Sequence, residues 1–208
     1  MTQIDQFRRE HQEEVEARGG KLTLTVLAMK AVIAALKEHP RFNASLDPDA
    51  EELVLKHYYH LGIAVDTDRG LIVPVVRDVD RKSLIELSEE LVELAERTRN
   101  GEATLEELQG GTFTITNVGP IGGTSFSPLI NYPQVAILGM ARARWEPVVV
   151  EQGEDVPARM GELRTETRYL LPLMLAFDHR VVDGADAARF MRSVVSVLED
   201  PDKLLLAL

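Results

Sequence analysis

The sequence predicts an α+β fold, a two-layer sandwich in which one mixed β-sheet carries helices on one side. Helix-like and strand-like segments follow one another without the strict alternation that is typical of a parallel α/β fold. The 208 residues are 45% hydrophobic, which is enough to bury one substantial core. Because no internal repeat or low-complexity linker divides the chain, we expect a single domain over residues 1–208.

Two helices are predicted at the start of the chain. Residues 3–18 are charged and compatible with a helix, which Gly19-Gly20 would end. Thr23 precedes the alanine-rich apolar run 24–36, which His39-Pro40 closes. This run predicts a well-buried helix with Thr23 as its N-cap.

Short β-rich runs come next, at residues 52–59, 61–66 and 71–77. Asp68-Arg69-Gly70 is a turn signal between the last two runs. We therefore expect three strands, the second and third joined by a tight turn.

Two capping boxes then predict helix starts. Ser83 and Glu86 form the first box, which opens a helix that continues to about residue 99 and ends at Asn100-Gly101. Thr104 and Glu107 form the second box, on a short helix that Gly110-Gly111 would stop.

The second half of the chain returns to strands. The runs with strand character are residues 112–116, 135–140, 146–150 and 170–177. The last run is continuously apolar, which predicts a central strand. Residues 151–168 are charged and are expected to form an exposed hairpin loop, and residues 184–198 form a final long helix.

Composition excludes several classes of function. The formal net charge of -11, from 23 basic and 34 acidic residues, disfavours nucleic acid as a partner. The absence of cysteine excludes disulfides, thiolate metal sites and a cysteine nucleophile. His57 and His60 would point to opposite faces of a strand, so no metal site is expected. No apolar run reaches the roughly 20 residues of a membrane span, and the first twenty residues are polar, so we expect no signal peptide, no membrane contact and an intracellular protein.

The densest polar cluster beside an apolar run is segment 177–184 (FDHRVVDG), where a predicted strand ends and a helix begins. His179 and Asp183 are four residues apart, so their side chains can lie close together. Asp183 is also a plausible helix N-cap, and His179 could be an ordinary hydrogen-bonded histidine. On the pattern alone the structural interpretation is favoured.

Segment 178–184 resembles the signature of the dihydrolipoamide acyltransferases, the core components of the 2-oxoacid dehydrogenase complexes. Five further motifs resemble the same family and occur in family order over nearly the whole chain. They are residues 40–43 (PRFN), 62–67 (GIAVDT), 70–74 (GLIVP), 113–119 (FTITNVG) followed by 122–124 (GGT), and 131–139 (NYPQVAILG). Chloramphenicol acetyltransferase shares the fold and the histidine motif, so the resemblance implies a chloramphenicol acetyltransferase-like fold. The intervening motifs are closer to the lipoyl-linked family.

The resemblance implies an acyltransferase that exchanges an acyl group, with a preference for acetyl, between dihydrolipoamide and coenzyme A. His179 would be the general base, and Thr116 would donate a hydrogen bond to the oxyanion. Asp183 would keep the histidine loop in place through hydrogen bonds or an arginine partner. Contacts to coenzyme A are implied for Arg8, Thr23, Asp66, Thr116 and Asn117. Without the resemblance, Thr116 would be an ordinary strand residue and Arg8 a solvated helix charge.

The family also implies a homotrimer, with His179 and Thr116 of one site supplied by different chains, and a larger cubic or icosahedral cage. The lipoyl group would come from a separate domain, because we expect this chain to lack the lipoyl and peripheral-subunit-binding domains and to begin inside the catalytic domain. The apolar end 204–208 fits burial against a neighbouring chain or against its own subunit. The charged stretch 151–168 is longer than the usual hairpin of the family.

Two alternatives stay open. One is a non-catalytic scaffold of the same fold, and the other is a free-standing acetyltransferase for a small hydroxyl or amine acceptor. The combination of His179, Asp183 and Thr116 favours catalysis, and the lipoyl-type motifs argue against the small acceptor. The family functions in the bacterial cytoplasm or the mitochondrial matrix, which are the expected locations, and the resemblance favours the pyruvate dehydrogenase type.

Overall fold

A mixed β-sheet forms the centre of the protein. The computed structural model describes residues 1–47, 49, 51–150 and 164–206. Within them, a five-stranded sheet has the order β11-β8-β7-β3-β6, with the parallel pairs β8/β7 and β7/β3 in the middle and an antiparallel pair at each edge. Its strands are β3 (Leu61–Ile63), β6 (Val75–Val76), β7 (Phe113–Asn117), β8 (Ala136–Met140) and β11 (Leu173–Phe177). The predicted mixed sheet is confirmed.

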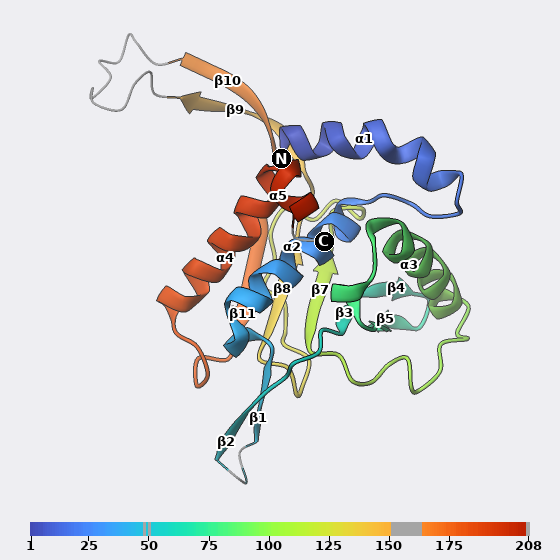
Figure 1. Cartoon of the computed structure of the whole chain (residues 1–208), viewed down its shortest axis with the longest axis vertical. Helices are drawn as coiled ribbons and strands as arrows, with labels where there is room; N and C mark the ends of the chain where they lie inside the picture. Colours follow the sequence, from blue (N-terminus) through green and yellow to red (C-terminus); the bar gives the residue numbers. More distant parts are fainter. Residues whose placement is uncertain (48, 50, 151–163, 207–208) are drawn as a thin grey trace.

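Two helices cover one face of this sheet (Figure 1). They are α2 (Leu24–Glu38) and α4 (Gly184–Glu199), which pack against each other. The Phe190 ring of α4 stacks on Phe42 at a centroid distance of 4.4 Å and meets Phe113 of β7 at 5.7 Å. Thr23 caps α2 as predicted, because its hydroxyl accepts a hydrogen bond from the N–H of Val26. The core therefore lies between these helices and the sheet.

The first and the last helix lie together beside α4 (Figure 1). Helix α1 (Thr2–Glu16) ends before Gly19-Gly20, as predicted, and contacts both α4 and α5 (Pro201–Leu206). Leu204 is fully buried within this chain, whereas Leu205 is 48% exposed. Burial of the apolar end against its own subunit is thus the observed arrangement for Leu204, and residues 207–208 lie outside the described residues.

Helix α3 (Leu84–Arg99) begins at the predicted capping box and packs beside the hairpin of β4 (Val65–Thr67) and β5 (Gly70–Ile72). The predicted turn joins these two strands, and Gly70 has a positive φ of 102° there. The predicted strands 61–66 and 71–77 are each divided in two. Pro74 lacks an N–H and its carbonyl accepts from Ile63, so the chain changes partners at this point.

Three other predictions from the sequence were wrong in part. Strand β2 (Glu52–Leu55) ends four residues before the predicted end of its run, and it pairs with an unpredicted strand, β1 (Ala44–Asp47). The box of Thr104 and Glu107 forms its hydrogen bonds but opens only a turn, because the glycines that follow leave too few residues for a helix. The run 170–177 breaks at Pro172, and β11 is an edge strand of the described sheet rather than a central one.

A long ribbon of two strands extends from the body of the protein (Figure 1). Strand β9 (Arg144–Val150) pairs antiparallel with β10 (Arg164–Leu170). The predicted loop 151–168 is therefore wrong from residue 164 onward, where the chain is already a strand, and 151–163 lies outside the described residues. The short 3₁₀ helices η1 (Pro40–Phe42) and η2 (Val79–Arg81) complete the elements. Over the ranges that the structure describes, no helix is both long and apolar enough to cross a membrane.

Candidate active site

A cavity of about 920 Å³ lies beside the face of the sheet that α2 and α4 leave uncovered. Strand β7 borders it because alternate side chains of a strand point to opposite faces: Phe113 and Ile115 enter the core, whereas Thr114 and Thr116 line the cavity. The N-terminal end of α2, helix α3 and the segment 118–131 provide the other walls, which are mainly apolar. Such a concave apolar space with a few polar groups suits a substrate with a flexible arm.

Four of the predicted site residues meet in this cavity: Thr23, Asp66, Thr116 and Asn117. Thr116 is only 8% exposed and lies opposite Gly139 of β8 in the sheet register. Asn117 is held firmly, since its Nδ2 donates to Thr25 Oγ1 at 3.1 Å and its Oδ1 accepts from the N–H of Gly119 at 2.9 Å. Asp66 is exposed at the rim. The cavity therefore offers the buried hydroxyl of Thr116 to a bound molecule.

The predicted base, His179, lies elsewhere on this chain. Its ring is exposed in the loop between β11 and α4, 5.6 Å from the ring of Phe177. Along the described chain, neither His179 nor Asp183 is among the residues that line the cavity. A single chain thus presents a hydroxyl in a cavity without the histidine, and the histidine on a separate surface.

Asp178 holds the histidine loop in place. Its N–H donates to Val135 O at 2.8 Å, and its carbonyl accepts from the N–H groups of Val181 and Val182, whose side chains are buried. Its carboxylate pairs with Arg180 Nη2 at 2.7 Å. The hydrogen bonds from Arg180 hold the pKa of the Asp178 carboxyl below its ordinary value, although partial burial opposes this. The arginine partner that the sequence suggested for Asp183 therefore belongs to Asp178.

Asp183 is the N-cap of α4, as the structural interpretation of the sequence proposed. Its Oδ1 accepts a hydrogen bond from the N–H of Asp186 at 2.8 Å. This bond is the main cause of a lowered Asp183 pKa, to which the charges of Arg189 and His179 contribute. Asp183 therefore fixes the point at which the histidine loop enters the helix.

In a single chain, Arg8 is not among the described residues that line the cavity. Its Nη2 lies 2.8 Å from Asp5 Oδ1, and Asp5 is also paired with Arg9. The interpretation of Arg8 as a solvated charge is also incomplete, because its side chain is only 27% exposed.

Two cations at the cavity were missed by the sequence analysis. Lys21 and Arg99 are exposed and line it, and either could meet a phosphate group. Lys21 stands two residues before the Thr23 cap, and Arg99 ends α3. Their positions next to predicted helix ends are the feature of the sequence that would have indicated them.

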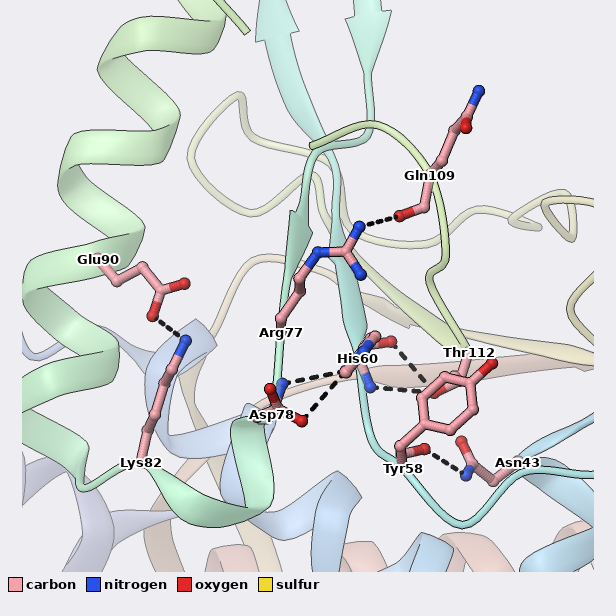
Figure 2. A network of polar contacts seen from close by, with 9 residues as sticks. All are labelled: Asn43, Tyr58, His60, Arg77, Asp78, Lys82, Glu90, Gln109 and Thr112. Atoms are coloured by element: carbon pink, nitrogen blue, oxygen red, sulfur yellow. Dashed lines mark hydrogen bonds and ion pairs between the residues drawn. The ribbon is translucent and has the colours of Figure 1, made fainter. Parts of the chain in front are cut away.

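A polar network around His60 lies outside the cavity (Figure 2). His60 Nδ1 accepts from the N–H of Asp78 at 3.0 Å, and the N–H of Thr112 donates to the carbonyl of His60 at 2.7 Å. Arg77 donates to the carbonyl of Gln109. These bonds join the segment before β3 to the residues that follow β6 and to those that precede β7, so they hold neighbouring strand ends together. Contrary to prediction, neither His57 nor His60 lies in a strand, and the described residues hold no cluster of three metal-ligand side chains.

Residues 1–206 match the family model described as 2-oxoacid dehydrogenases acyltransferase (catalytic domain). A curated relative from Haemophilus influenzae is 44% identical over 208 residues, which are 99% of this chain and 35% of the relative. That relative is named the dihydrolipoyllysine-residue acetyltransferase component of pyruvate dehydrogenase complex. The chain thus spans about a third of the length of this relative.

The solved structures that resemble this chain include proteins of the same kind. An Azotobacter vinelandii dihydrolipoamide acetyltransferase, studied for the role of a serine, a histidine and an asparagine in its mechanism, has a TM-score of 0.88 at 43% identity. The cubic core of a pyruvate dehydrogenase multienzyme complex has the same TM-score and identity. Both alignments cover 98% of this chain and 79% of the other. Chloramphenicol acetyltransferase, with a TM-score of 0.53 at 16% identity over 89% of this chain and 81% of that one, confirms the predicted fold and nothing more.

Proposed function

Because the chain belongs to the family of 2-oxoacid dehydrogenase acyltransferase catalytic domains, we propose that it transfers an acetyl group between dihydrolipoamide and coenzyme A. The observation that carries this proposal is the nearly buried hydroxyl of Thr116, which faces a cavity large enough for a substrate arm. The name of the relative at 44% identity supports acetyl as the acyl group.

The proposed reaction is a thioester exchange. The attacking thiol gives its proton to His179, and its sulfur bonds to the carbonyl carbon of the thioester. The tetrahedral intermediate then collapses: the bond to the other sulfur breaks, and that thiolate takes the proton back from His179. No electrons are exchanged with a third group and no acyl-enzyme is needed, which fits a chain without cysteine.

Thr116 would donate its hydroxyl to the oxyanion of the intermediate. One such donor contributes roughly 100-fold or more in rate. In the A. vinelandii enzyme a serine and an asparagine were studied beside the histidine. A threonine keeps the hydroxyl of a serine, and Asp183 caps a helix as well as an asparagine would. If Thr116 takes the place of that serine and Asp183 that of the asparagine, Thr116 would be the oxyanion donor and Asp183 would position the histidine loop.

We further propose that a second copy of the chain completes the site. His179 is exposed on one surface of the subunit, and the cavity with Thr116 is separate from it. A homotrimer would bring the two together, and the similarity to a cubic core supports a larger cubic assembly. Within the cavity, coenzyme A would contact Thr23, Asp66 and Asn117. Arg8 would contact it only across a subunit boundary. A separate domain would supply the lipoyl group.

Turnover measurements test the proposal. The protein is mixed with dihydrolipoamide and, in turn, acetyl-, isobutyryl- and succinyl-coenzyme A, and thioester formation is followed. Acetyl transfer should be fastest, and His179→Ala should lower its rate at least about 100-fold, since a general base is lost. His57→Ala, at an exposed histidine outside the cavity, is the matched control. Unchanged turnover in His179→Ala would reject the mechanism and leave the scaffold alternative.

A further inference from the structure

Three side chains, those of Asn131, Thr114 and Gln134, form a hydrogen-bonded row, and two of them, Thr114 and Asn131, line the cavity. Thr114 of β7 is fully buried, and its Oγ1 donates to Gln134 Oε1 at 2.6 Å. The same Oγ1 accepts from Asn131 Nδ2 at 3.2 Å. A hydroxyl has a single proton, so its donation to Gln134 leaves only lone pairs for Asn131. The row therefore turns the Nδ2 of Asn131 toward the strand and its side-chain carbonyl away from it.

The surrounding backbone fits this row closely. A Cβ on Gly62 would lie 2.8 Å from Thr114 Oγ1, and a Cβ on Gly111 would lie 2.9 Å from Gln134 Nε2. The N–H of Gln134 also donates to the carbonyl of Asn131 at 2.8 Å, within one turn. These contacts hold the side chains of Thr114 and Gln134 in place, and the Thr114 hydroxyl in turn orients the amide of Asn131.

The side-chain carbonyl of Asn131 is available to a ligand. Asn131 lines the cavity and is partly buried, and no described residue donates a hydrogen bond to its Oδ1. The cavity is also lined by Ile63, Val73 and Phe126, so the carbonyl of Asn131 is one of few polar groups in a mainly apolar space. In such pockets a few placed polar groups set the orientation of the ligand.

Asn131 also lies near the proposed point of reaction. Thr114 and Thr116 face the same side of β7, and residues two apart in a strand are separated by about 6.7 Å. The pantetheine arm of coenzyme A carries an amide N–H two methylene groups from its sulfur. In a thioester whose carbonyl oxygen accepts a hydrogen bond from Thr116, the distance from this oxygen to the amide N–H is similar to the distance between Thr116 and Thr114. The N–H would therefore lie near the row that contains Asn131.

We propose that Asn131 binds the substrate, with its side-chain carbonyl accepting a hydrogen bond from the amide N–H nearest the sulfur of the pantetheine arm. Thr114 is then a positioning residue, which acts through Asn131 by fixing the direction of its amide, and Gln134 fixes the hydroxyl of Thr114. The inference rests on the proposed acetyl transfer and assigns the group that orients the coenzyme A side of the reaction.

Two small acetyl donors test the contact. The acetyl thioester of N-acetylcysteamine keeps the amide N–H, and the acetyl thioester of 2-mercaptoethyl acetate has an ester oxygen in its place. With dihydrolipoamide as acceptor, the wild-type protein should prefer the amide donor about tenfold in kcat/KM, the factor for one hydrogen bond. Asn131→Ala and Thr114→Val should reduce this preference to less than about twofold, whereas Thr114→Ser, which keeps the hydroxyl, should retain it.

The ratio of the two donors separates binding from damage to the fold, because a misfolded variant loses both activities together and leaves the ratio unchanged. The inference is overturned if the wild-type protein shows no preference, or if the preference survives in Asn131→Ala. It is also overturned if Asn131→Ala instead removes a preference for dihydrolipoamide over methyl dihydrolipoate, which would put the contact on the lipoyl arm. Failure of the proposed function looks different: the wild-type protein would not transfer acetyl from acetyl-coenzyme A at all.

Discussion

Asp183 is the residue through which the histidine loop is joined to α4. Its carboxylate accepts the N–H of Asp186, so Asp183→Ala leaves a helix start without its cap. We expect Asp183→Ala to lower Tm by about 3 °C, and Asp183→Asn to leave it nearly unchanged, because both residues cap helices well. Thermal unfolding of the three proteins at pH 7 measures this difference, and equal losses in both variants would contradict it.

The pH dependence of this cap has a definite sign. The Asp183 pKa is below its ordinary value of 3.8, mainly because of the N–H of Asp186. Its contribution to stability is therefore present above pH 3.8 and is lost as the pH falls through the lowered pKa. In Asp183→Asn this part of the acid sensitivity should be missing, so the two unfolding curves should diverge only below that pH.

The residues of the site were predictable to different degrees. His179 and Thr116 lie in continuous motifs, so their places could be proposed from the sequence. Thr114, Asn131 and Gln134 could not, because their hydrogen bonds join positions 17 and 20 residues apart that no helix or strand period relates. Asp178 was overlooked for another reason: a bond between Asp178 and Arg180 needs the tight turn of that loop, which local pattern does not reveal.

Within α2, one buried charge gives a prediction at the scale of the element. Lys30 is 1% exposed, and its Nζ donates to Val79 O at 3.1 Å, which ties α2 to η2. Burial is the main cause of a lowered Lys30 pKa; the charge of Lys37 adds to it, and Asp80 and Glu86 oppose it. Protonation of Lys30 therefore lowers the stability of the folded protein, because the buried ammonium group is desolvated.

Lys30→Met removes this charge at similar volume. As the pH rises from 7 toward the ordinary lysine value of 10.5, the folded protein loses the Lys30 proton before the unfolded chain does. The unfolded state then binds more protons, so the stability of the wild-type protein should rise relative to that of Lys30→Met. Urea unfolding across this range measures the effect, with Lys203→Met, at an exposed lysine, as control. A stability difference that does not change with pH would contradict the prediction.

The elements themselves were predicted best where a local signal decides them. The Ser83 box and the Thr23 cap start helices whose apolar faces continue for four turns, and both helices form as expected. The Thr104 box has the same local signal without such a face behind it, and only a turn results. Strand ends were predicted less well, because Pro74 and Pro172 interrupt apolar runs whose pairing depends on neighbours far along the chain.

At the scale of the whole molecule, the order of the strands in the sheet could not be predicted from the sequence. The run 170–177 is as apolar as a central strand, yet all five residues of β11 are only half-buried at the edge of the described sheet. Figure 1 shows the β9–β10 ribbon leaving the body next to α1. On this ribbon the exposed ring of Trp145 lies 5.1 Å from the ring of Tyr169, which is partly buried. An edge strand and a ribbon of this kind are surfaces that a neighbouring copy could cover, in keeping with the proposed assembly.

A test of that assembly uses two inactive chains. His179→Ala removes the base and Thr116→Val removes the oxyanion donor, so each should lose at least about 100-fold in rate when it is alone. If His179 and Thr116 of one site come from different chains, co-expression in equal amounts restores some sites. Half of the chains offer an intact His179 and half of their neighbours an intact Thr116, so ½ × ½ predicts about one quarter of wild-type activity in mixed assemblies.

The control for this complementation is a chain that carries both substitutions, co-expressed with wild type in equal amounts. The same pairing gives about one quarter of intact sites between chains, whereas a site formed within one chain gives one half. Mixed single variants at background activity, together with one half in the control, would place both groups in one subunit. Because His179 and the cavity occupy separate surfaces of the described chain, we expect one quarter in both experiments.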